Sequence, residues 1–181
     1  MAQHGRAANS ETTTALLSAL CFFLSTIEYM IPKPLPFIRI GIANLPIIIA
    51  SDLLTFRSFL LLVSLKVLGQ AIITGSLFSY VFLFSLGGTV VSALSMYGLR
   101  KVFGKKRISF IGLSIIGALL SNSVQIVLAW LFIFGKSAKF IAPPLLLLGL
   151  VTGCILGYVA QLFAEKSRWF AVQLEGMQSL K

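Results

Sequence analysis

Long apolar runs, separated by short polar or proline-rich breaks, make up most of the chain. A bilayer core of ~30 Å needs about 20 apolar residues in a helix, and Gly, Pro and charged clusters mark the breaks between helices. The predicted spans are 13–31, 37–54, 56–77, 80–102, 108–134 and 144–164. The pattern therefore predicts an all-α integral membrane protein, a bundle of six transmembrane helices.

The same pattern predicts how the chain is organised around this bundle. A polar N-terminal segment, residues 1–12, precedes the membrane domain of residues 13–164, and residues 165–181 follow it as a tail. No small-residue cleavage site follows the first apolar run, so we expect a retained helix rather than a signal peptide. Trp169 and Phe170 indicate a short interfacial helix in the tail, with aromatic anchors.

Prolines interrupt the apolar pattern at three places. The segment 32–36 contains three prolines and predicts an extended surface loop or a re-entrant cap. Pro46 lies inside the second span, which we expect to be kinked or broken near residues 43–46. Broken membrane helices often line binding sites. The pair Pro143 and Pro144 predicts the start of the last span.

Composition and charge support a membrane protein and predict its orientation. The chain is 57% hydrophobic and 11% charged, whereas soluble domains carry about 25% charged residues. Ten Lys and Arg residues lie on the side of the termini and four on the other, which predicts cytoplasmic termini in the inner membrane and excludes nucleic acid as a partner. The ten are Arg6, Arg57, Arg100, Lys101, Lys105, Lys106, Arg107, Lys166, Arg168 and Lys181, against Lys33, Arg39, Lys136 and Lys139.

Lys66 lies halfway along an apolar span, where a cation costs roughly 2.5–3.5 kcal/mol. Other polar residues fall at the same outer level of neighbouring spans and make a candidate substrate-binding site. Its residues are Glu28, Arg39, Asn44, Lys66, Gln70, Asn122 and Gln125. Their positive surplus favours an outward-facing pocket for a small polar solute with an anionic or carbonyl-rich part. The alternative is structural, namely interhelical hydrogen bonds and a buried ion pair.

Small residues indicate close helix packing. Gly149, Gly153 and Gly157 repeat every four residues in the last span, which favours internal packing. Ala15 and Ala19 are spaced in the same way in the first span, but alanine is common in membrane helices. Cys21 and Cys154 lack a redox or metal-ligand spacing and are interpreted as small core residues.

Several segments together resemble the Gx transporter family, whose members are also labelled heptaprenyl diphosphate synthase component I. The resemblance rests on residues 28–32, 39–44, 75–79, 85–88 and 117–118, with Asn122 and Gln125. The family usually has a histidine immediately before the asparagine that matches Asn122, whereas this chain has Ser121. A role for that histidine therefore does not carry over.

The family is similar to the substrate-binding S components of energy-coupling-factor vitamin transporters. That resemblance implies six membrane helices, cytoplasmic termini and an outward-facing pocket capped by the loop after the first helix. It also implies that Ala15 and Ala19 form a partner interface with a transmembrane T component driven by two ATPases.

Two other classes of function remain open. A self-sufficient small-molecule carrier would need polar residues through the whole bilayer, but here they concentrate in the outer half. The second class that remains open is an accessory membrane subunit in prenyl diphosphate or quinone metabolism. We do not expect catalysis by this chain, because prenyl diphosphate synthesis needs aspartate-rich magnesium motifs and Asp52 is the one aspartate. His4 has no catalytic partners, and we expect no metal, no cofactor and no ATP-binding motif.

Overall fold

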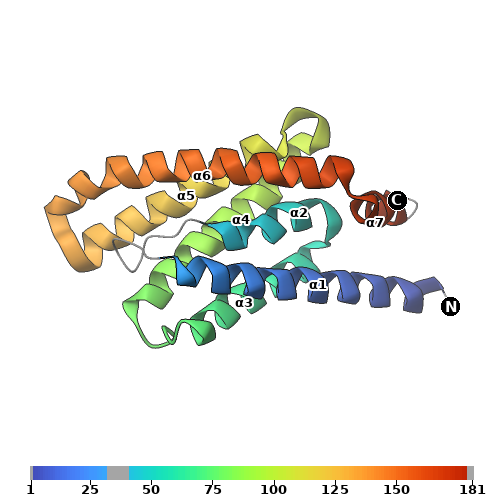
Figure 1. Cartoon of the computed structure of the whole chain (residues 1–181), viewed down its shortest axis with the longest axis horizontal. Coiled ribbons are helices and arrows are strands. Elements are labelled where there is room, and N and C mark those ends of the chain that lie inside the picture. Colours follow the sequence, from blue (N-terminus) through green and yellow to red (C-terminus); the bar gives the residue numbers. More distant parts are fainter. Residues whose placement is uncertain (1, 32–40, 179–181) are drawn as a thin grey trace.

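The computed structural model describes residues 2–31 and 41–178, and all regular structure within them is helical (Figure 1). The main helices are α1 (Ala2–Met30), α2 (Leu45–Leu53), α3 (Phe56–Ile73), α4 (Tyr80–Arg107), α5 (Phe110–Ala129), α6 (Ala138–Lys166) and α7 (Arg168–Gln178). Short turns are η1 (Ile42–Asn44), η2 (Trp130–Phe134) and η3 (Gly135–Ser137). The predicted all-α fold is confirmed.

Five of the described helices are long and apolar enough to cross a membrane, whereas the second predicted span is not. Its helical part is the short segment Ile42–Leu53, so the predicted count of six full spans is not confirmed. The cause is local. Gly41 adopts a left-handed conformation with φ of 87°, and Pro46 stands in the first turn of α2. The break predicted near residues 43–46 is present, with one 3₁₀ turn before α2.

The short α2 helix is the core of the bundle. All of its residues from Pro46 to Leu53 are buried, and it contacts α1, α3, α4, α5, α6 and α7. A helix that is apolar on every side is stable only when other elements surround it. It begins inside the bundle and runs back to the end where α1 starts and α7 lies (Figure 1). Both ends of the described chain are therefore at the same end of the bundle.

Several helix boundaries differ from the prediction. The α1 helix begins at Ala2, within the polar segment that precedes the first predicted span. The α6 helix begins at Ala138, so the proline pair 143–144 lies inside it instead of starting it. Each proline removes only its own backbone N–H donor near the helix start, and the helix continues upstream of both. The connection between α3 and α4 is short, because α3 ends at Ile73 and α4 begins at Tyr80.

The helix α7 packs on the bundle with one of its two expected anchors buried. Phe170 is buried against Phe110 of α5, with ring centroids 6.2 Å apart. Trp169 is half-buried and packs near Phe163 of α6. Phe170 is thus a core residue instead of a lipid anchor, because α7 folds back against the bundle.

The predicted glycine packing is present between α5 and α6. A Cβ atom on Gly157 would lie 2.5 Å from the Ile111 Cα atom, and one on Gly153 would lie 3.0 Å from the Ile115 Cα atom. Only glycine permits this approach of the two backbones.

A buried ion pair joins the C-terminal end of α2 to α4. Arg100 donates to both carboxylate oxygens of Asp52, at 2.6 and 2.7 Å, and also to the Ile108 carbonyl oxygen. The guanidinium carbon lies 4.6 Å from the Phe110 ring centroid. Arg100, which the orientation count places among the cations on the side of the termini, is therefore buried in an ion pair.

We predict that Gly157→Ala lowers the thermal unfolding midpoint of the purified protein in detergent, because the added methyl group collides with the α5 backbone. Overpacking of this kind costs about 1–3 kcal/mol. Gly98→Ala in α4 is the matched control, since no atom lies within 4 Å of its added methyl group. Equal midpoints for the two variants would contradict the close packing of α5 on α6.

Replacing Arg100 by Met is expected to cost about 3–5 kcal/mol, because the carboxylate of Asp52 stays buried without its cation. The double variant Asp52→Leu/Arg100→Met should recover much of that loss. Thermal midpoints in detergent measure both effects, and Arg107→Met, at an exposed position on the same helix, is the control. A single variant as stable as the control would show that the pair contributes nothing.

Candidate functional site

The break before α2 exposes backbone donors, and Glu28 of α1 satisfies them. The Gly41 amide donates to Glu28 Oε1 at 3.1 Å, and the Ala43 amide donates to Oε2 at 3.2 Å. Only 1% of the Glu28 surface is exposed. The left-handed conformation of Gly41 turns the chain here, and glycine adopts it without steric cost. Glu28 therefore anchors the start of the segment that leads into α2.

Lys66 of α3 is 2% exposed, and its ammonium group donates hydrogen bonds to two side chains. Its Nζ donates to Asn44 Oδ1 at 3.0 Å and to Thr89 Oγ1 of α4 at 3.1 Å. The lysine thus joins α3 to α4 and to the start of α2. Asn44 is oriented by this bond, because its oxygen faces Lys66 and its nitrogen is left on the other side.

Two amide side chains of α5 make buried hydrogen bonds, one to α6 and one within α5 itself. Asn122 Nδ2 donates to the Leu145 carbonyl oxygen of α6 at 2.7 Å. Gln125 Nε2 donates to Ser121 Oγ, one turn away, at 3.3 Å. Both amides are buried. The Asn122 bond joins α5 to α6, as interhelical hydrogen bonds do in membrane bundles, whereas the Gln125 bond stays within α5.

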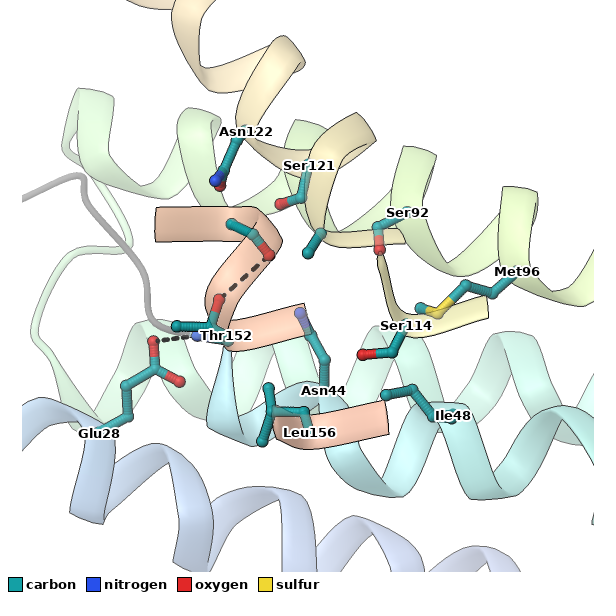
Figure 2. Close-up of a pocket in the computed structure, with 13 residues that line it drawn as sticks. Glu28, Asn44, Ile48, Ser92, Met96, Ser114, Ser121, Asn122, Thr152 and Leu156 are labelled. Carbon is teal, nitrogen blue, oxygen red and sulfur yellow. Dashed lines mark hydrogen bonds between the residues drawn. The ribbon is translucent and has the colours of Figure 1, made fainter. Parts of the chain in front are cut away.

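A small polar pocket lies between the start of α2 and the helices α4, α5 and α6 (Figure 2). The described residues that line it are Glu28, Gly41, Asn44, Ile48, Ser92, Met96, Ser114, Ala118, Ser121, Asn122, Gly149, Thr152 and Leu156. Its volume is about 30 Å³, whereas a cavity needs roughly 10–15 Å³ by this measure to hold one water. A larger solute therefore requires movement of the residues that line it.

The structure brings together only some of the predicted site residues. Glu28, Asn44 and Asn122 line the pocket, and Lys66 reaches it through its bond to Asn44. Gln70 and Gln125 are buried but do not line it. Arg39 lies outside the described residues.

Sequence reasoning missed the hydroxyl groups of the pocket. Ser92 of α4, Ser114 of α5 and Thr152 of α6 line it beside Ser121. A single serine in an apolar span is a weak signal, because its hydroxyl often bonds to its own helix. Thr152 Oγ1, for instance, donates to the Leu148 carbonyl oxygen at 2.9 Å.

These features define a class of protein, a multi-pass helical membrane protein with a polar pocket inside its bundle. One family profile, described as heptaprenyl diphosphate synthase component I, matches residues 17–163, and the chain belongs to that family. It is the family that resembles S components. No curated protein and no solved structure matches the chain. The family bears the name of a synthase component but is thought to be a membrane subunit, so the absence of catalysis stays a prediction.

We predict that Glu28→Ala speeds hydrogen–deuterium exchange of the backbone amides at residues 41–45, because the Gly41 and Ala43 amides lose their acceptor. Glu28→Gln, which keeps one carbonyl oxygen, should fall between Glu28→Ala and the parent protein. Mass spectrometry of peptides covering this segment measures the exchange. Glu11→Ala, at an exposed glutamate on the same helix, is the control; an equal rate in Glu28→Ala and this control would show that the carboxylate does not anchor the segment.

Proposed function

We propose that the chain is the substrate-binding subunit of a membrane uptake system, similar to an S component. It binds a small polar, vitamin-like solute, and partner ATPases drive uptake through a transmembrane T component. The observation that carries this proposal is the polar pocket beside the broken segment at residues 41–45, within a chain of an S-component-like family.

The position of the pocket supports binding without independent transport. Its polar residues come from the part of the bundle around the start of α2 (Figure 2). Beyond the start of α2, the helix itself contributes buried apolar residues such as Ile47, Ile49 and Leu53. A carrier that works alone needs polar groups on both sides of its site, so a partner that reorients the subunit fits this arrangement better.

The charged surface supports the proposed orientation in the cytoplasmic membrane. Lys101 and Arg107, at the end of α4, and Lys166 and Arg168, around the start of α7, are exposed. They lie at the end of the bundle where α1 begins (Figure 1). Under the positive-inside rule this end faces the cytoplasm, which is where ATPases are found.

The proposed partner interface is on α1. Ala15 and Ala19 are both exposed, next to the exposed side chains of Leu16 and Leu20. Small residues on an exposed helix face allow another helix to approach closely. A T component with helices that cross α1 here would bury this face.

A second candidate function is an accessory membrane subunit beside a soluble prenyl diphosphate synthase. The description of the family as a synthase component favours it. The two functions differ in their partners, so the proteins that copurify with the chain distinguish them.

We expect the tagged chain, purified gently from its own cells, to retain a T component and two ATPases in stoichiometric amounts by native mass spectrometry. The variant Ala15→Phe/Ala19→Phe should lose them, because two bulky rings would block close helix approach. Cys154→Phe, which places the same ring at an exposed position of α6, should retain them. Recovery of a soluble prenyl synthase in place of ATPases would overturn the proposal in favour of the second candidate.

A further inference from the structure

The two ends of the pocket differ in charge. Glu28 lies at one end, next to Gly41 (Figure 2). At the other end, which we name the inner end, four neutral polar side chains surround the cavity. They are Asn44, Ser92, Ser114 and Ser121. No Lys, Arg or His is among the described residues that line the pocket.

Several polar groups of the inner end can donate further hydrogen bonds to a ligand. Ser92 is 2% exposed, and its buried hydroxyl has no hydrogen-bond partner. Ser121 Oγ accepts from Gln125 Nε2, which leaves its hydrogen available to donate. The Ser114 hydroxyl and the Asn44 amide nitrogen point into the cavity (Figure 2). A buried polar group without a partner is costly, so a ligand that completes these bonds gains affinity.

Lys66 acts on the inner end through Asn44. Its ammonium group donates to Asn44 Oδ1 and so withdraws electron density from the amide. Hydrogen bonds in a chain polarise one another, which makes Asn44 Nδ2 a stronger donor toward the cavity. Lys66 itself is not among the described residues that line the pocket. The described residues of the inner end therefore present neutral donors and no cation.

We infer that the inner end receives an uncharged, carbonyl-bearing group of the solute, such as an amide or a ring imide, and selects against a carboxylate or phosphate. This rests on the proposed function and specifies its substrate. A carbonyl oxygen accepts from Asn44 Nδ2 and the serine hydroxyls, all of which donate. None of the described residues that line the pocket is a cation, so an anion buried against them would lose its hydration at a large cost without gaining an ion-pair partner from them. The volume of about 30 Å³ suits one small group of this kind.

The test uses neutral and anionic molecules of matched shape. The pairs are nicotinamide and nicotinate, uracil and orotate, and riboflavin and its 5′-phosphate. Dissociation constants are measured by ligand-observed nuclear magnetic resonance on the purified chain in detergent micelles. At least one neutral member should bind about 10-fold or more tightly than its anionic partner, since the anion loses its hydration without gaining a cation.

Substitutions show whether binding occurs at the inner end. Ser114→Leu fills the cavity and should abolish the binding of the neutral probe. Ser123→Leu on the same helix is the matched control, because Ser123 is exposed and bonds to its own helix at Leu119. Ser92→Ala removes one hydroxyl with little change in volume and should weaken binding by about 3- to 10-fold.

Two results would overturn the inference. One is an anionic probe that binds to the parent protein as tightly as its neutral partner and no longer binds to the Ser114→Leu variant. The other is the absence, across all three pairs, of any neutral binding that Ser114→Leu removes and Ser123→Leu retains. Neither result bears on whether the chain copurifies with ATPases. The binding experiment therefore tests the inferred substrate class, and the copurification experiment tests the proposed uptake function separately.

Discussion

The carboxylate of Glu28 makes it feasible to break the second apolar run inside a bilayer. An unsatisfied backbone N–H costs several kcal/mol in hydrocarbon, and the break at Gly41 releases such donors. Glu28 accepts from two of them, at Gly41 and Ala43. The chain then enters the bundle as a 3₁₀ turn and the short α2 helix. Without this acceptor the amides of Gly41 and Ala43 would lose their hydrogen-bond partner inside the bundle.

The α2 helix is held at both ends by buried cations, and this decides the charge of the pocket. Lys66 binds Asn44 at the start of α2, and Arg100 binds Asp52 near its end. Counting charges along the sequence indicated a positive surplus at the site. In the structure Lys66 donates to the neutral oxygen atoms of Asn44 and Thr89 and is not among the described residues that line the cavity. The described lining residues are the basis of our inference that a carbonyl group is the ligand in place of an anion.

The pocket lies between two packed groups of helices. α1 packs on α3 and on the segment around η1, while α5 packs between α4 and α6. Glu28 and Asn44 come from the first group, and Ser92, Ser114 and Thr152 come from the second. A solute in the pocket contacts both groups and links them.

The sequence alone determined the class of the protein, the long helices and the break near Pro46, because apolar length and proline act locally along the chain. It also picked out Glu28, Asn44 and Asn122, since polar residues in apolar spans are conspicuous. Only the tertiary structure decided that α2 is too short to span, that Arg100 pairs with Asp52, and that Ser92 and Ser114 face one cavity. These three features depend on how the helices are rotated and paired. They bring together residues that are far apart in the sequence, so the pattern along the chain does not reveal them.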